Sequence, residues 1–224
     1  MHAMLEGIHH RFTEGFVVVL VLIVAVMTAG CARLPYTTTV VHEDPRLAVK
    51  LQREIKPAGY TQPVQLSKPE LRALLKGFSL REQKSLPLRW FAEEVPPTPV
   101  FREDELDVLT TQLADAFAKA SPNERVYFEL YAPGKNPRDE RDVTAGWTAV
   151  REPYFYLSIL YFHVQQPIHT QDTYYPYYTT TRPTPKSYLL YFEPARYWIL
   201  DETFGGRGVD LRGFLKSGEA SSGR

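Results

Sequence analysis

The chain has very little cysteine, with one residue, Cys31, among 224. A single thiol cannot close an intramolecular disulfide, so a small secreted fold held together by bridges is excluded. A zinc site built on several thiolates is excluded for the same reason. Cys31 directly follows an apolar run and a few small residues, which indicates a role other than that of a small buried hydrophobic residue.

The chain also lacks an excess of charge of either sign. Lys and Arg number 26, Asp and Glu number 26, and the sequence pI is about 7.0. No overall field would attract the chain to nucleic acid or to acidic lipid, so the overall charge disfavours both, and we expect no nucleic-acid partner. Hydrophobic residues make up 44% of the chain, which is ordinary for a globular protein with a packed core.

Signatures of catalysis are missing as well. The chain contains no serine elbow, no HExxH helix and no P-loop. A glycosidase needs two carboxyl groups about 5 to 9 Å apart across a cleft, and nothing in the sequence places such a pair. We interpret three acidic groups as solvated charge beside turns, and predict no catalytic residue: Glu93-Glu94, Asp139-Glu140-Asp142 and Asp201-Glu202.

The histidines do not indicate a metal site. His42 falls in an expected tether, and His163 ends an expected strand, where a hydrogen-bonded side chain is the simpler interpretation. His163, His169 and Asp172 could in principle share a metal ion, but such ligands need a preformed cage and supporting partners, of which the sequence gives no sign. We therefore predict no metal and no bound cofactor.

What the chain does have is a short apolar leader. Residues 16–27, FVVVLVLIVAVM, are twelve consecutive apolar residues, whereas a membrane-spanning helix takes about 20. Thr28, Ala29 and Gly30 then separate this run from Cys31. A run of this length followed by small residues is typical of a signal peptide and its cleavage site.

Residues 1–33 resemble the signal peptide of a bacterial lipoprotein, whose last positions match Ala29-Gly30-Cys31 here. The resemblance implies that a diacylglycerol thioether forms on the sulfur of Cys31, that residues 1–30 are removed, and that the new amino group is acylated. Two or three acyl chains would anchor the protein firmly, since each buried CH₂ contributes about 0.8 kcal/mol. Ala32 stands where inner-membrane lipoproteins often have Asp, which implies the outer membrane, facing the periplasm. The rest of the chain does not resemble a family.

An uncleaved membrane anchor is the alternative interpretation of the leader. Residues 16–32 carry no charge, and a stretch of that length can cross a thin or locally compressed bilayer. The mass of the mature amino terminus separates the two possibilities.

The remaining sequence predicts an α+β fold, a mainly antiparallel sheet with two helices packed on one face. We expect a flexible tether over residues 31–45, one domain over 46–215 and a disordered tail over 216–224. Alternating apolar residues predict strands near 47–52, 126–131, 143–150 and 154–165, the last two as a hairpin, and a further hairpin over 187–192 and 196–200. Residues 205–208 are expected to form a flexible glycine-rich turn.

Two helices are expected from spacing and capping. Ser67 followed by Pro69 and Glu70 is a helix start with a capping box, and Gly77 is a suitable stop. Leu106, Leu109, Leu113 and Phe117 form one apolar stripe after an acidic first turn at residues 103–105. Residues 87–92 are expected to be extended.

The most unusual stretch is QDTYYPYYTTTRPTP, residues 171–185. Tyr174, Tyr175, Tyr177 and Tyr178 offer rigid amphipathic surface suited to a protein partner or to sugar rings. Alternatively, these tyrosines cover a sheet edge or extend the strands, because Tyr and Thr also favour strands. The sequence thus predicts a membrane-anchored envelope lipoprotein with a non-enzymatic interaction or structural role; a peptidoglycan- or polysaccharide-binding protein or hydrolase is the alternative.

Overall fold

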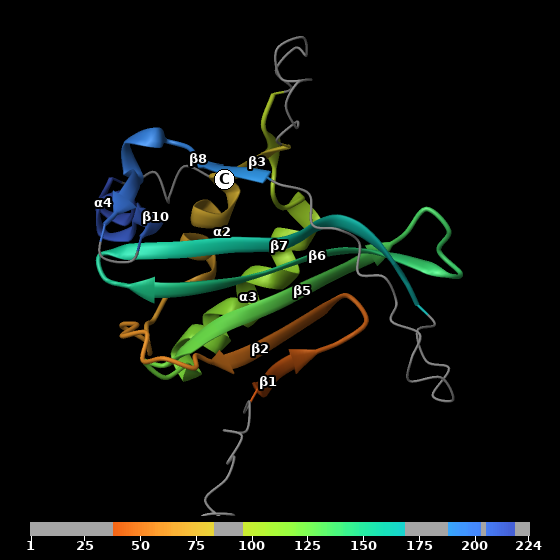
Figure 1. Cartoon of the computed structure of the whole chain (residues 1–224), viewed down its shortest axis with the longest axis horizontal. Helices are drawn as coiled ribbons and strands as arrows, with labels where there is room; N and C mark the ends of the chain where they lie inside the picture. The colour runs from red at the N-terminus through yellow and green to blue at the C-terminus, as the bar shows by residue number, and fades with distance from the viewer. Residues whose placement is uncertain (1–37, 83–95, 169–187, 203–204, 218–224) are drawn as a thin grey trace, which may run out of the picture. The chain divides into compact units, whose positions relative to one another are not determined.

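The computed structural model describes residues 38–82, 96–168, 188–202 and 205–217. These residues form the predicted α+β fold, dominated by antiparallel sheet (Figure 1). No helix within these ranges is both long enough and apolar enough to cross a membrane. The leader and its Cys31 lie outside the described residues.

A seven-stranded antiparallel sheet is the largest element of the structure. Its strands, in sheet order, are β1 (Thr38–Glu43), β2 (Leu47–Arg53), β5 (Glu124–Pro133), β6 (Glu140–Arg151), β7 (Tyr154–Pro167), β10 (Gly206–Asp210) and β9 (Trp198–Asp201). β6 and β7 form the predicted hairpin, paired from Arg151 opposite Tyr154 to Glu140 opposite Pro167. Within β7, Phe155, Tyr156 and Leu157 are buried, whereas Leu160 is 43% exposed.

A second, three-stranded sheet corrects one prediction. It consists of β4 (Thr98–Pro99), β3 (Phe78–Glu82) and β8 (Tyr188–Phe192), with β3 in the middle. The predicted hairpin over 187–192 and 196–200 is wrong, because β8 pairs with β3 and β9 pairs with β10 of the large sheet. The 3-10 helix η2 (Ala195–Tyr197) carries the chain from one sheet to the other.

Within the described ranges, three helices accompany the sheets: α2 (Lys68–Lys76), α3 (Glu103–Lys119) and α4 (Leu211–Lys216). α2 and α3 were predicted, and both lie on the same side of the large sheet, behind it in Figure 1. The stripe of α3, from Leu106 to Phe117, is buried against Val126, Phe128 and Leu130 of β5. Outside the core, Arg72 of α2 forms ion pairs with Glu103 and Asp107 of α3.

The start of α2 has the predicted capping box. The Ser67 hydroxyl donates to the Glu70 carboxylate at 2.6 Å, the Ser67 backbone N–H donates to that carboxylate at 2.7 Å, and the Glu70 N–H donates to the Ser67 oxygen. We expect Ser67→Ala to lower the free energy of unfolding by about 1 kcal/mol, because a helix N–H loses its acceptor. Denaturant unfolding measures this. Lys68→Ala, at the next and exposed position, is the control, and an equal loss in both variants would contradict the capping role.

Three predicted segments differ from the structure. Residues 38–43 of the predicted tether form β1, which pairs with β2. The predicted flexible turn over residues 205–208 is wrong for residues 206–208, because residues 206–210 form β10. Lys216, the first residue of the predicted tail, ends α4. The expected extended segment 87–92 and residues 218–224 lie outside the described residues.

Candidate functional site: the open face of the large sheet

The two faces of the large sheet differ in what covers them. Buried side chains of α2, α3 and α4 all belong to one core cluster, together with Val126, Phe128 and Leu130 of β5. Strand residues alternate between faces, so the opposite face, here called the open face, meets no helix within the described residues. Strand register gives its main members: Ala48, Lys50, Arg125, Tyr127, Glu129, Tyr131, Ala145, Trp147, Ala149, Tyr154, Tyr156, Tyr161, Gly208 and Asp201.

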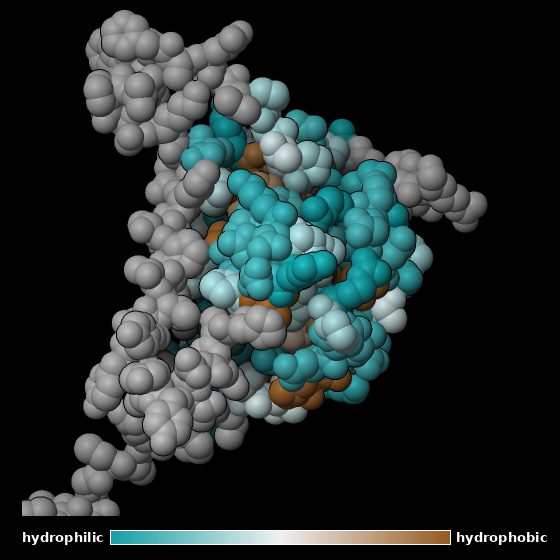
Figure 2. Space-filling model, turned by 90° about the vertical axis from the view of Figure 1, so that its right-hand side faces the viewer, coloured by the Kyte–Doolittle hydropathy of each residue, from teal (hydrophilic) through white to brown (hydrophobic). Residues whose placement is uncertain are grey.

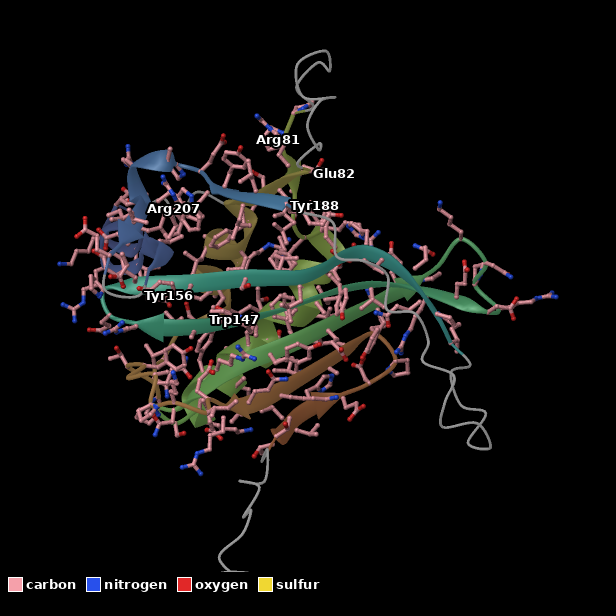
Figure 3. The ribbon with its side chains drawn as sticks, in the orientation of Figure 1. Arg81, Glu82, Trp147, Tyr156, Tyr188 and Arg207 are labelled. Carbon is pink, nitrogen blue, oxygen red and sulfur yellow. The ribbon has the colours of Figure 1, made fainter. Side chains whose placement is uncertain are left out.

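Aromatic rings of the open face lie over small residues. Ala48, Ala145 and Ala149 are 0% exposed although no described helix packs on them. A Cβ built on Gly208 would lie 3.1 Å from the ring of Tyr156. The Tyr156 ring therefore occupies the space that a side chain at position 208 would need. Figure 3 views the sheet from this side and labels Trp147 on β6 and Tyr156 on β7.

One carboxylate binds two tyrosines at the centre of the open face. Both hydroxyls donate to Glu129, Tyr127 at 2.6 Å to Oε1 and Tyr131 to Oε2. Burial raises the pKa of Tyr127 and of Tyr131, and the bond to Glu129 raises each further. Both hydroxyls therefore keep their protons to a higher pH than a free tyrosine does, and both donate to the same carboxylate.

Two arginines stack on rings of the same face. The guanidinium of Arg125 lies 5.3 Å from the ring centroid of Trp147, and that of Arg141 lies 4.2 Å from that of Tyr131. Such contacts between cations and aromatic faces are attractive. The open face therefore combines Tyr, Trp and Arg with a single shared carboxylate at its centre.

Asp201 corrects the prediction of solvated carboxylates. It is 8% exposed, and the Tyr156 hydroxyl donates to its Oδ2. Burial, followed by the bond to Asp201, raises the pKa of Tyr156. This pair ties β9 to β7 across β10. Among the other predicted acidic groups, Asp139 is exposed and bonds Asn136 at 2.5 Å in the β5–β6 turn, as expected of a turn carboxylate, and Glu93-Glu94 lie outside the described residues.

The other end of the sheet holds a groove. It has a volume of about 650 Å³ and lies between the start of α3, the β1–β2 turn and the β5–β6 hairpin. Its charged residues pair with one another: Arg46 contacts Asp104 at 3.2 Å and Arg102 contacts Glu105 at 2.6 Å. Figure 2 shows this end of the molecule to be predominantly hydrophilic, with small separate apolar patches.

Several residues singled out in the sequence are not brought together. Cys31, the four tyrosines 174, 175, 177 and 178, His169 and Asp172 lie outside the described residues. His163 has a positive φ of 49° and its Nδ1 lies 3.1 Å from Asp142. His42 lies on β1 and contacts Asp44 at 2.8 Å. Within the described ranges, no cluster of three or more metal-binding side chains occurs.

The open face was overlooked in the sequence although part of its signal is there. Tyr127, Glu129 and Tyr131 alternate with the buried Val126, Phe128 and Leu130, which identifies a mixed face on one strand. Whether such a face is aromatic as a whole depends on the side chains of the neighbouring strands, β2 and β6. Trp147 lies opposite Tyr127, and this pairing needs the register of β6.

Comparison with known proteins gives no relative. No model of a protein family matches the chain, and no curated protein and no solved structure matches it either.

Proposed function

We propose that the chain is a non-enzymatic lipoprotein of the bacterial cell envelope, anchored by acyl chains on Cys31, whose open face binds a protein partner. The composition of that face is the observation that carries the binding role. Tyr, Trp and Arg are the residues that most often dominate binding energy at protein interfaces. Two of these rings, Trp147 and Tyr131, have an arginine guanidinium against them, and large amphipathic rings on an open sheet suit contact with a protein surface.

The positions of the held carboxylates favour binding over hydrolysis. Glu129 is on β5 and Asp201 is on β9, four strands further along the sheet. At about 4.8 Å per strand these carboxylates are roughly 19 Å apart, whereas a glycosidase pair is separated by about 5 to 9.5 Å. Each is also engaged by tyrosine hydroxyls, Glu129 by two and Asp201 by one.

Site-specific crosslinking in the native envelope tests the partner. A photoreactive amino acid replaces Trp147, and a matched control replaces Thr111, which is exposed on α3. We expect a discrete protein adduct from position 147 and none from position 111. Absence of an adduct at 147, or the same adducts from both positions, would overturn the proposal. An adduct that glycosidases remove and proteases do not would instead identify a polysaccharide ligand.

The tyrosine-rich segment provides a competing location for the same role. A chain with serine at Tyr174, Tyr175, Tyr177 and Tyr178 should keep the adduct from position 147 if the open face is the binding surface. Loss of the adduct in this variant, with an unchanged melting temperature, would transfer the recognition role to residues 171–185.

The anchor has its own test. Mass spectrometry of the native protein should find a mature chain beginning at Cys31 with a diacylglycerol thioether and an acylated amine. Cys31→Ser should remain unprocessed and should carry no lipid. A native chain that still begins at Met1 would support the uncleaved anchor instead.

A further inference from the structure

The first strand of the described residues lies close in sequence to the proposed lipid anchor. Thr38 is the first residue of β1 and pairs with Gln52, one residue before the end of β2. Only residues 32–37 separate Thr38 from Cys31. A fully extended chain spans at most about 3.6 Å per residue, so seven steps reach about 25 Å. A lipid on Cys31 would therefore hold this end of the sheet near the membrane surface, far closer than the predicted fifteen-residue tether allows.

The segment just beyond β2 presents an apolar side chain between two cations. Ile55 is 71% exposed, more than any other large hydrophobic residue in the described ranges. Arg53 and Lys56 on either side are exposed, and neither forms an ion pair with a described residue. We call residues 53–56 the anchor-side tip, because β2 ends beside the first residue of β1.

The one acidic residue of the tip does not cancel these charges. The Glu54 carboxylate accepts the Tyr60 hydroxyl at 3.1 Å and lies 3.4 Å from the guanidinium of Arg125. Glu54 is thus directed back to the folded body and is paired there. Glu54 therefore forms no ion pair with Arg53 or Lys56.

An apolar side chain flanked by free cations fits the interface of an anionic bilayer. The apolar group enters the boundary between headgroups and acyl chains, and the long basic side chains extend to the phosphates. Position distinguishes Ile55 from Leu200, the next most exposed large hydrophobic residue in the described ranges. Leu200, which is 56% exposed, is on β9, the opposite edge strand of the sheet from β1.

We propose that the anchor-side tip is a second membrane contact, which inserts Ile55 into the interface of an anionic phospholipid bilayer and fixes the orientation of the domain. This inference rests on the lipid anchor of the proposed function. With lipid and tip both attached, the β1 edge lies nearest the membrane and the β9 edge lies farthest away, roughly 29 Å further at six strand spacings of about 4.8 Å. The sheet would then be roughly perpendicular to the membrane, and its open face would be accessible to an envelope partner from the side.

The test uses the full lipidated protein purified from its own membranes. Ile55→Cys is labelled with an environment-sensitive fluorophore, and Leu200→Cys, labelled in the same way, is the matched control. Both proteins are reconstituted into vesicles of phosphatidylethanolamine and phosphatidylglycerol that contain a lipid-borne quencher. We expect several-fold stronger quenching at position 55 than at position 200, and a loss of that difference when Arg53 and Lys56 are both replaced by Glu. Vesicles of phosphatidylcholine alone should weaken the quenching at 55.

The outcomes separate this inference from the anchor itself. A protein that does not sediment with vesicles overturns the lipid anchor. A protein that sediments but shows equal quenching at 55 and 200 overturns the tip as a membrane contact. Quenching at 55 that does not change with lipid charge or with the two Glu substitutions overturns the choice of an anionic surface. Both labelled positions are exposed, so neither substitution should alter the melting temperature.

Discussion

Phe78→Ala is expected to lower the free energy of unfolding by about 3 to 5 kcal/mol, the usual cost of removing a fully buried phenylalanine ring. Phe78 is 1% exposed and joins the two sheets. Its ring centroid lies 4.9 Å from that of Phe192 on β8 in its own sheet, 6.2 Å from Phe155 on β7 and 5.9 Å from Trp198 on β9. A cavity here would remove contacts between both sheets at once.

Denaturant unfolding checks the effect of Phe78→Ala, with Leu189→Ala as the control. Leu189 is on β8 of the same three-stranded sheet but is 39% exposed. Its truncation should therefore lower the free energy of unfolding by less than about 1 kcal/mol. A lower midpoint with an unchanged dependence on denaturant would be a pure change in stability. Equal losses in the two variants would mean that Phe78 is not the link between the sheets.

Local patterns in the sequence predicted the helices and several strands well. The stripe of α3 was identified because residues three and four apart share a face, and its members are buried as expected. The start of α2 was identified because Ser67 and Glu70 stand at the spacing of a capping box. In both cases the interactions that determine the element connect residues within four positions of each other.

Interactions between distant segments could not be predicted in this way. β3 and β8 pair with Phe78 opposite Phe192, more than a hundred residues apart, and nothing local marks either as the other's partner. The predicted hairpin joined β8 to β9 because they are adjacent in sequence. For the same reason β1 was interpreted as tether, since its edge position on the sheet leaves its residues mostly exposed and its pattern weak.

The open face could not be predicted for the same reason, because it needs the pairing between distant strands. The alternation in β5 predicted a mixed face, but the contacts that shape this face involve other strands. Trp147 of β6 lies opposite Tyr127 of β5, and the Tyr156 hydroxyl of β7 donates to Asp201 of β9. Asp201 was interpreted as solvated because its partner is 45 residues away in the chain.

Alkaline pH is expected to unfold the domain cooperatively, because four tyrosines are held in their neutral form. Burial raises the pKa of each, and a neighbouring carboxylate raises it further: Tyr60 beside Glu54, Tyr127 and Tyr131 beside Glu129, and Tyr156 beside Asp201. The unfolded chain ionises these groups near pH 10, whereas the folded chain keeps their protons. The stability they contribute is therefore fully present below pH 10 and is lost as the pH rises above it.

The expected loss of stability at alkaline pH is large enough to unfold the domain. Each tyrosine that stays protonated only in the folded state lowers the free energy of unfolding by about 1.4 kcal/mol per pH unit above 10. Four of them lower it by roughly 5.5 kcal/mol per unit, against a total stability of about 5 to 15 kcal/mol. We expect the ultraviolet absorbance of phenolate to rise in two phases, the second together with loss of circular dichroism. Tyr127→Phe, which removes one of the four groups, should shift this second phase to higher pH. A single phase near pH 10 with the fold intact would show that the hydroxyls on Glu129 and Asp201 ionise freely, and that the polar bonds across the open face contribute little to holding it.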